Sequence, residues 1–254
     1  MLKRRTFASV CCDVGDLRTV NQDRILVRHG EMAGRQVGLF MVADGCGGLS
    51  HGETISHLLA DSFRVIWEEA LPRFLENAED PEKELIPALM NWVEQINASA
   101  YGFGQQIAQR VGSTLTLLVT IDKAYYILNV GDSRVYLCRG KDMLQLTEDQ
   151  SLVADLLRNR EITPEEAKHF GRKNVLTMCV GCFEKVQIFR TSGKLRKGDI
   201  FLLCSDGLHS ILGEDQIQKW LPKRLEENSA TILRDHIPPG AARDNVSVLL
   251  VEIR

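Results

Sequence analysis

Five aspartates stand beside apolar runs, at places where a strand would hold a carboxylate rigidly. Asp44 closes GLFMVA, Asp206 closes IFLLCS, and Asp132 follows YYILNVG. Asp244 precedes NVSVLLV, and Asp23 lies in RTVNQDRILV, immediately before another apolar run. Asp-Gly is a common turn dipeptide, so Asp44 or Asp206 taken alone would indicate only a turn.

As a set, these carboxylates indicate a metal site. Burying a carboxylate at the edge of a core costs free energy unless it is paired or coordinates a cation, and too few basic residues lie beside the five to pair them all. Mg²⁺ and Mn²⁺ take oxygen ligands. At Gly45 a backbone carbonyl could approach an ion without a Cβ in the way. Two ions held about 3.5–4 Å apart can activate a water and stabilise a phosphoryl transition state.

Arg18 is the candidate group for holding a phosphate. It lies five residues before Asp23. A guanidinium binds phosphate oxygens in a bidentate manner. From its chemistry alone, a solvated loop arginine is an equally open interpretation.

The neighbours of Asp44 in ADGCGGLSHGE offer further candidates. Cys46 and His51 could both do chemistry. We interpret Gly47 and Gly48 as shaping a turn that lets metals sit close to the backbone. His51 is interpreted as the start of a helix.

The bulk composition is that of a globular protein with one domain, 1–254. The chain has 254 residues, 44% of them hydrophobic and 26% charged. A net charge of -3 argues against a general nucleic-acid binder. The longest apolar runs, such as Leu115 to Ile121, are too short to span a membrane. No signal-peptide core follows the basic N-terminus, so we expect a cytoplasmic protein that does not associate with membranes.

The seven cysteines form no regular framework, which predicts reduced thiols rather than disulfides. Cys179 and Cys182 make a C-x-x-C. A zinc site would need a second half, such as another C-x-x-C, and none is visible. We interpret the pair as structural or incidental thiols.

Periodicity and turn residues predict an α+β fold. Helices are predicted at about 53–71, 80–96, 150–158, 164–169, 214–221 and 229–236, and strand-like runs at 37–43, 112–122, 123–133, 134–146, 186–193, 199–206 and 245–253. Thr163 and Glu166 are spaced as a capping box. Helical segments flanking many hairpin-connected strands favour two packed, mostly antiparallel sheets covered by helices.

Seven motifs together resemble one family. RTVNQD, VADGCGG, GSTLT, NVGDSRVYL, LTEDQS, CSDGL and RDNVSVLLV occur in the order and at about the distances found in metal-dependent (PPM, type 2C) Ser/Thr protein phosphatases. The chain is most similar to the short bacterial stand-alone form, from about Ala8 to Ile253. The resemblance implies a central sandwich of two antiparallel β-sheets flanked by helices (αββα). It also implies a flap at about 150–181 and a binuclear metal site at one end of the sandwich.

The resemblance also implies roles for the carboxylates. Asp44 would bridge two Mn²⁺ or Mg²⁺ ions, and the Gly45 carbonyl would bind the second. Asp206 and Asp244 would hold the first. Asp23 would support the second ion through its waters.

Two further residues receive implied roles. Asp132 matches the position that contributes to a third, weaker metal in bacterial members, and Arg18 would bind the substrate phosphate. The implied reaction is hydrolysis of phosphoserine or phosphothreonine in proteins, by direct in-line attack of a metal-bridging water. Metal charge and Arg18 would offset the charge on the phosphoryl oxygens.

Four positions depart from the family pattern. Cys46 stands where eukaryotic members have a histidine proposed as general acid and bacterial members commonly have methionine, so a metal-bound water would protonate the leaving group. Gln22 replaces a glutamate near the second metal. Gln150 replaces a frequent histidine and Met178 a frequent arginine. The last two changes bear on substrate preference more than on catalysis.

Two alternatives remain open. A pseudophosphatase would keep the fold as a binding module, although all four metal aspartates (Asp23, Asp44, Asp206 and Asp244) are present here. Another two-metal phosphoester hydrolase would normally bring histidine ligands, and the six histidines show no metal spacing. The expected partners are phosphorylated proteins, targets of a Ser/Thr kinase, and the expected state is a monomer.

Overall fold

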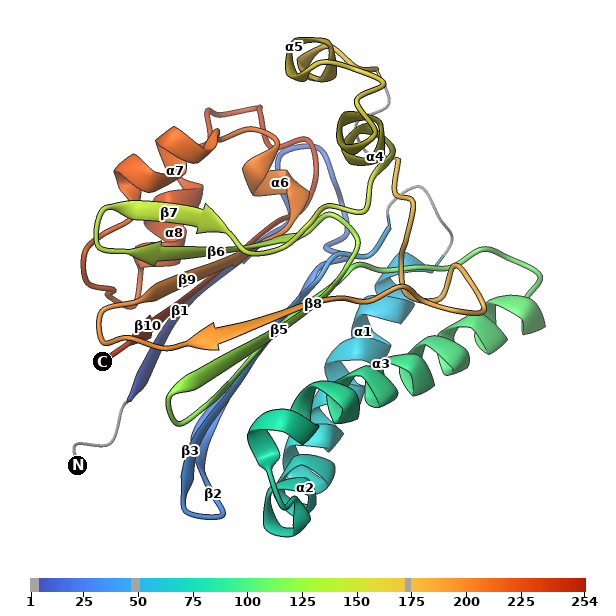
Figure 1. Cartoon of the computed structure of the whole chain (residues 1–254). Coiled ribbons are helices and arrows are strands. Elements are labelled where there is room, and N and C mark those ends of the chain that lie inside the picture. The colour runs from blue at the N-terminus through green and yellow to red at the C-terminus, as the bar shows by residue number, and fades with distance from the viewer. Residues whose placement is uncertain (1–4, 47–50, 172–174) are drawn as a thin grey trace.

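The computed structural model, which describes residues 5–46, 51–171 and 175–254, contains a sandwich of two five-stranded antiparallel sheets (Figure 1). The first sheet consists, in order, of β1 (Thr6–Asp13), β10 (Val246–Ile253), β9 (Ile200–Cys204), β6 (Arg134–Arg139) and β7 (Asp142–Gln145). The second consists of β2 (Arg24–Met32), β3 (Arg35–Ala43), β4 (Leu115–Ile121), β5 (Ala124–Val130) and β8 (Phe189–Lys194). The predicted α+β sandwich is therefore confirmed.

Helices cover the outer face of each sheet (Figure 1). The β2–β8 sheet is covered by α1 (Gly52–Val65), the π-helical turn η1 (Ile66–Ala70), α2 (Leu71–Asn77) and α3 (Pro81–Gln106). The other sheet is covered by α6 (Asp206–His209), α7 (Glu214–Trp220) and α8 (Ser229–Arg234). Two short helices, α4 (Leu152–Arg158) and α5 (Pro164–Lys168), stand beyond one end of the sandwich. Within the described ranges, none of the helices is long and apolar enough to cross a membrane.

Strand β3 shows why the apolar runs are nearly continuous. Its side chains alternate, so that Leu39 and Met41 pack into the core under α1–α3. Phe40 and Val42 pack between the two sheets. Because both faces of the strand are buried, its residues are almost all apolar rather than alternately apolar and polar.

The predicted helix at 53–71 is interrupted in the structure. α1 ends at Val65, five residues follow as a π-helical turn, and α2 then begins at Leu71. Pro72 explains the change, because it lacks an N–H and its ring clashes with the carbonyl four residues earlier in an α-helix. A wider turn before the proline accommodates both effects.

Two expected helix starts are confirmed. The Thr163 side chain accepts from the Glu166 N–H, and the Glu166 carboxylate accepts from the Thr163 N–H, which is the predicted capping box. His51 is the residue that directly precedes α1, with a left-handed φ of 58°. The expected turn at Gly47 and Gly48 lies outside the described residues.

The prediction that all cysteines are reduced is wrong for one pair. Cys179 and Cys182 form a disulfide. The turn between them contains Gly181 at φ 89°, which brings the two Cα atoms to 5.7 Å, within bridging range. The remaining five cysteines are free.

Candidate active site

The five aspartates lie at the same end of the sandwich, because the strands beside them begin or end there. Asp23 immediately precedes β2 and Asp44 directly follows β3. Asp132 lies between β5 and β6. Asp206 begins α6 after β9, and Asp244 lies two residues before β10. The Asp44 carboxylate interacts electrostatically with the other four, so the structure brings the whole predicted set together.

Burial and mutual repulsion disfavour the charged forms of these carboxylates. Burial raises the pKa of Asp44 well above its usual range, and repulsion from the other aspartates adds to the rise. The pKa values of Asp23 and Asp206 rise to about 6 for the same reasons. That of Asp132 rises to about 8. A cation bound among them would favour their charged forms and reverse these shifts.

Asp23 gives a direct test of whether a metal fits. Its side chain is fully buried, and one carboxylate oxygen, Oδ2, accepts a hydrogen bond of 2.9 Å from the Ser205 hydroxyl. The other, Oδ1, is buried and finds no hydrogen-bond partner among the described residues. A buried carboxylate oxygen without a partner is costly, and water held by a cation would satisfy it.

Gly45 lies in a cradle that other residues could not enter. A Cβ there would lie 2.7 Å from the Gly52 carbonyl group and 2.8 Å from the Gln22 carbonyl oxygen. Both obstacles are backbone, so a larger residue would displace the turn that follows Asp44. This packing explains why a glycine is needed at position 45, and the predicted role of its carbonyl as a metal ligand stays a prediction. Oxygen donors from Asp44 and its neighbours suit hard divalent ions.

The carboxylates are spread rather than tightly convergent. In the described part of the chain, no group of three Asp, Glu, His or Cys side chains is arranged to hold an ion alone. Mg²⁺ typically keeps several waters and takes one or two protein carboxylates. The donor set therefore fits ions whose coordination is completed by a backbone carbonyl and by water.

Arg18 faces the carboxylate cluster. Its Nη2 lies 2.8 Å from Asp244 Oδ2, and its side chain is 39% exposed. The hydrogen bond to Asp244 raises the pKa of Arg18, and the charges of Asp44 and Asp206 act in the same direction. Arg18 is thus an exposed loop arginine that pairs with one of the five carboxylates, and its phosphate-binding role stays a prediction.

Asn245 fixes the loop that carries Arg18, a role that the sequence reasoning missed. Its Nδ2 donates to the carbonyl oxygens of Val14, at 2.8 Å, and Val20, at 3.1 Å. Its Oδ1 accepts from the Gln22 N–H at 2.9 Å. The Asn245 amide thus holds both ends of the loop that carries Arg18. In the sequence, only its position beside Asp244 in RDNVSVLLV could have indicated this role.

Two hydroxyl residues before β4 hold Asp44, and they also had no assigned role. Thr114 accepts from the Asp44 N–H through Oγ1 at 3.0 Å, and its own N–H donates to the Asp44 carbonyl at 2.8 Å. The Ser113 hydroxyl donates to the same carbonyl at 3.0 Å. The motif GSTLT therefore positions the backbone of the central aspartate.

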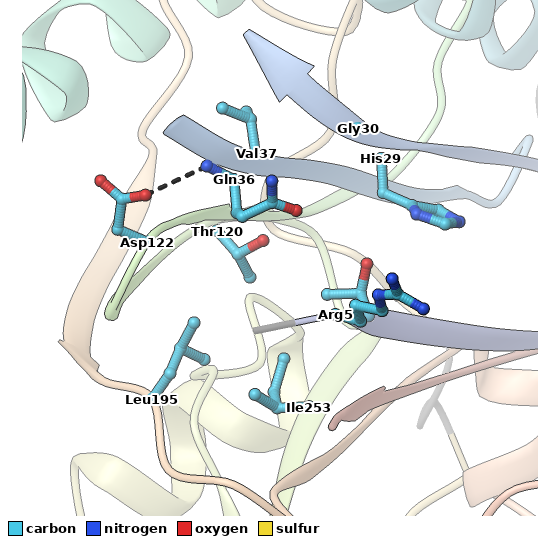
Figure 2. A pocket seen from close by; sticks show the side chains of 10 residues that line it. Arg5, His29, Gly30, Gln36, Val37, Thr120, Asp122, Leu195 and Ile253 are labelled. Carbon is cyan, nitrogen blue, oxygen red and sulfur yellow. Dashed lines mark hydrogen bonds between the residues drawn. The ribbon is translucent and has the colours of Figure 1, made fainter. Parts of the chain in front are cut away.

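The opposite end of the sandwich also has a cavity, of about 160 Å³ (Figure 2). Its lining includes one carboxylate, Asp122, together with His29, Thr120 and Leu195. Asp122 already accepts hydrogen bonds from the Gln36 N–H at 3.0 Å and from Arg35 at 3.1 Å. Because these partners satisfy its charge, this cavity lacks the excess of negative charge found at the other end.

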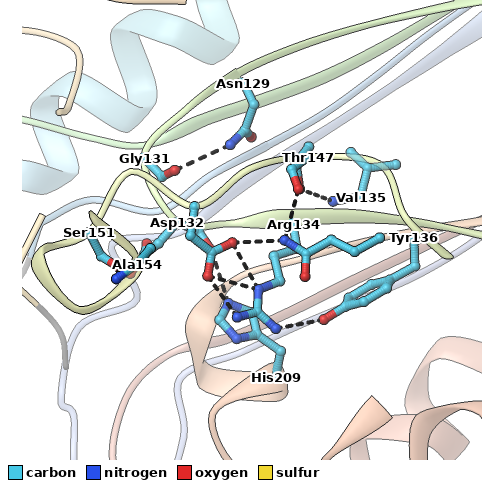
Figure 3. A network of polar contacts seen from close by, with 12 residues as sticks. Asn129, Gly131, Asp132, Arg134, Val135, Tyr136, Thr147, Ser151, Ala154 and His209 are labelled. Carbon is cyan, nitrogen blue, oxygen red and sulfur yellow. Dashed lines mark hydrogen bonds and ion pairs between the residues drawn. The ribbon is translucent and has the colours of Figure 1, made fainter. Parts of the chain in front are cut away.

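Asp132 is supported by the polar network in Figure 3, which sequence reasoning did not foresee. His209 Nε2 lies 3.0 Å from the Asp132 carbonyl oxygen. Burial lowers the pKa of His209 to about 3, and the charge of Arg134 adds to this, so the ring is neutral and donates through Nε2. Arg134 donates to the Tyr136 hydroxyl at 2.8 Å and pairs with Asp149 at 2.6 Å. The network fixes the backbone around Asp132.

Gln150 connects the predicted flap to the Asp132 loop. Its Oε1 accepts from the Gly131 N–H at 2.8 Å, and its own N–H donates to the Gly131 carbonyl at 3.0 Å. With Met178 it lines a cavity of about 350 Å³ beside Arg158 and Phe189. Gln150 and Met178, the two flap residues that depart from the family pattern, thus line the same cavity.

The metal-free protein is expected to lose stability as the pH rises from about 4 to about 8. Unfolded aspartates titrate near 3.9, whereas the folded values reach about 6 and about 8. Between these limits the native state binds more protons, so raising the pH lowers the free energy of unfolding. Melting temperatures measured in EDTA between pH 5 and 8 test this, and saturating Mn²⁺ should flatten the decline. A metal-free melting temperature that rises with pH would contradict the assignment.

A helix-covered β-sandwich with carboxylates and an arginine at one end is the architecture expected of the metal-dependent (type 2C) phosphatases. Residues 17–238 match the family described as Protein phosphatase 2C. Over 248 residues the chain is 32% identical to Protein phosphatase PhpP of Streptococcus pneumoniae, with 96% of each covered. The chain therefore belongs to the protein phosphatase 2C family, and the resemblance carried by the seven motifs is confirmed.

Solved structures agree with this membership. Serine/threonine phosphatase Stp1 from Staphylococcus aureus superposes with a TM-score of 0.86 at 27% identity, covering 97% of this chain and 94% of that one. The catalytic domain of serine/threonine phosphatase PstP, in complex with two manganese ions, gives 0.79 at 26% identity, covering 98% and 99%. These similarities extend over the sandwich and both helical layers.

Proposed function

We propose that the chain hydrolyses phosphoserine and phosphothreonine in proteins, with the five aspartates holding two Mn²⁺ or Mg²⁺ ions and Arg18 binding the substrate phosphate. The observation that carries the proposal is the gathering of five carboxylates, four of them with raised pKa values, beside Arg18. The chain is a protein serine/threonine phosphatase, and its relatives include the protein phosphatase PhpP and the serine/threonine phosphatases Stp1 and PstP. The two manganese ions in the PstP structure support the choice of metal.

The position of each carboxylate supports its proposed ligand role. Asp44 interacts with all four other carboxylates, which suits it to bridge two ions, with the Gly45 carbonyl binding one of them. Asp206 and Asp244 would hold the other ion. Asp23, with one satisfied and one unsatisfied oxygen, would act through a coordinated water.

Two residues complete the set. Asp132, in the turn between β5 and β6, would contribute to a third and weaker ion, and the hydrogen bond between its carbonyl oxygen and His209 would fix its backbone. Bound ions supply an activated water and positive charge at the phosphoryl oxygens. Arg18 would orient the phosphate from its clamped loop. In the metal-free protein, burial raises the pKa of Cys46 and the charges of Asp44 and Asp132 add to the rise, which disfavours a thiolate nucleophile there.

Replacing Arg18 with alanine is expected to raise the KM for phosphopeptides about 10- to 100-fold, because a charge-assisted hydrogen bond to phosphate is lost. The kcat should change much less, since the metal ligands remain. Steady-state kinetics with a phosphothreonine peptide at saturating Mn²⁺ would measure both. Arg73→Ala, on an arginine of α2 whose side chain is 76% exposed, is the matched control. An unchanged KM in Arg18→Ala would rule out the phosphate role.

A substrate panel tests the function itself. Purified protein with Mn²⁺ should release phosphate from p-nitrophenyl phosphate and from phosphoserine and phosphothreonine peptides, but should not hydrolyse cyclic nucleotides. Turnover of cyclic nucleotides alone would favour another two-metal hydrolase. Folded, metal-loaded protein without any turnover would favour a binding module.

The finer biological assignments belong to the same proposal. Phosphorylated proteins are the substrates, and we propose that a Ser/Thr kinase produces them. The chain would act as a cytoplasmic monomer, with 1–254 as one domain and about 150–181 as its flap. Helix α4 and the cavity beside Gln150 lie in or next to this flap, where a substrate chain would pass.

A further inference from the structure

The Cys179–Cys182 disulfide lies at the end of the flap segment and has no role in the proposed reaction. Cys179 is 4% exposed, whereas Cys182 is partly exposed. A disulfide that closes so short a loop constrains the unfolded chain little, so general stabilisation does not explain it. Paired cysteines at C-x-x-C spacing are typical of thiol–disulfide exchange sites.

The disulfide loop is held on two sides. Asn97 of α3 accepts from the Gly181 N–H at 2.9 Å and donates to the Phe183 carbonyl at 3.0 Å. Val180 and Ser113 exchange both of their backbone hydrogen bonds, at 2.9 and 3.1 Å. The loop is therefore joined by an isolated β-bridge to the segment that precedes β4.

The segment before β4, residues 112–114, also contacts the proposed metal ligands Asp44 and Gly45. Ser113 pairs with Gly45 on its other side, and its hydroxyl donates to the Asp44 carbonyl at 3.0 Å. The Cys46 N–H donates to the Gly112 carbonyl at 3.0 Å. A continuous set of main-chain contacts thus joins the disulfide loop, through residues 112–114, to the two residues that would bind both metals.

We propose that Cys179 and Cys182 form a reversible thiol–disulfide modification site for dithiol reductants, and that their bond keeps Asp44 and Gly45 in position to bind divalent ions. Breaking the bond lets the two sulfurs separate to non-bonded distance. The turn at Gly181 then loses its closure, and the Val180–Ser113 pairing loses its outer support. The inference rests on the proposed function, because it concerns the affinity of the same metal site.

The exchange reaction balances with a dithiol as the two-electron donor. A thiolate of the reductant attacks Sγ of Cys182, forming a mixed disulfide and releasing Cys179 as a thiolate that takes up a proton. The second thiol of the reductant then attacks the mixed disulfide. It releases Cys182, which is also protonated, and the reductant leaves as a disulfide.

Cys182 is the sulfur that a reductant can reach. It is the more exposed of the two, whereas Cys179 is buried against the core. Sγ of Cys182 lies 3.3 Å from the Val111 carbonyl oxygen, so the reduced thiol has an acceptor in place. In single variants, Cys182 in Cys179→Ser should therefore react with iodoacetamide faster than Cys179 in Cys182→Ser.

The main experiment compares oxidised and reduced wild-type protein by thermal shift against Mn²⁺ concentration. Peptide mapping after alkylation verifies the state of the pair. The Mn²⁺ concentration that gives half of the maximal rise in melting temperature should increase about tenfold on reduction, the lower end of what loss of support behind a metal ligand costs. Half-saturating Mn²⁺ in p-nitrophenyl phosphate turnover should shift in parallel.

Variants separate this effect from general action of the reductant. Cys179→Ser/Cys182→Ser should behave as the reduced protein with or without reductant, and Cys138→Ser, at a free and partly buried cysteine, should keep the wild-type response. If the double variant does not fold, the wild-type comparison decides alone. Seven free thiols before reduction, or less than a twofold shift, would overturn the inference. If Mn²⁺ raises the melting temperature of the oxidised and reduced proteins equally, the redox inference fails but the proposed function stands. If Mn²⁺ stabilises neither protein, both the inference and the proposed function are overturned.

Discussion

Asp44→Asn is expected to abolish Mn²⁺-dependent phosphatase turnover, by about three orders of magnitude or more, and yet to raise the melting temperature of the metal-free protein. Activity is lost because an amide cannot bridge two cations as a carboxylate does, and metal charge supplies several kcal/mol of transition-state stabilisation. Stability rises because burial and four neighbouring carboxylates disfavour the charge at this position. The amide has the same shape without that charge.

The two effects have opposite signs, so a damaged fold cannot imitate them. Turnover of p-nitrophenyl phosphate with Mn²⁺ and melting temperature in EDTA at pH 7.5 measure them separately. Asp142→Asn, at an exposed position of β7, is the control and should change neither. Retained turnover in Asp44→Asn would refute the bridging role, and a lower metal-free melting temperature would refute the electrostatic argument.

Gly207→Ala is expected to lower the free energy of unfolding by about 3 kcal/mol, the upper part of the range for overpacking a close contact. A Cβ at Gly207 would lie 2.0 Å from the Asn245 carbonyl oxygen and 3.0 Å from its carbon. Neither backbone atom can move without shifting the start of β10. Gly207 directly follows Asp206, and Asn245 directly follows Asp244. A displacement of their backbones should therefore also weaken Mn²⁺ binding.

The matched control is Gly102→Ala in α3, where a new Cβ meets nothing within 4 Å. Alanine favours a helix over glycine by up to about 1 kcal/mol, so this variant should be neutral or more stable. For a chain of this size, a loss of about 3 kcal/mol corresponds to a fall of about 6–12 °C in melting temperature. Equal melting temperatures of the two variants would show that the start of α6 at Gly207 does not pack closely against the Asn245 backbone.

The sequence was informative about the ends of strands because burial there conflicts with charge. An apolar run that stops at an aspartate, as at Asp44 and Asp206, predicts both a buried strand and a buried carboxylate at its end, whose charge a cation would stabilise. The order of seven motifs then implied the topology. Long-range pairing has no local signal, and neither β1 nor its pairing with β10 was among the predicted features.

The parts that could not be predicted depend on contacts between distant segments. The pairing of Cys179 with Cys182 requires the left-handed turn at Gly181, and thiol spacing does not reveal backbone conformation. His209 reaches Asp132 across 77 positions of sequence. The π-helical turn before Pro72 reflects a proline whose cost was not considered in the helical pattern.

The ion pair between Arg18 and Asp244 has a consequence for the order of binding. In the proposed site one carboxylate serves both a cation and the arginine that receives phosphate, so the two ligands are thermodynamically linked. An ion held by Asp244 would weaken its pairing with Arg18 and so leave the guanidinium available for the phosphate. Linkage then requires that substrate change the affinity for the ion by the same factor as the ion changes the affinity for substrate. Metal and phosphoprotein would act as mutual effectors through a single 2.8 Å contact.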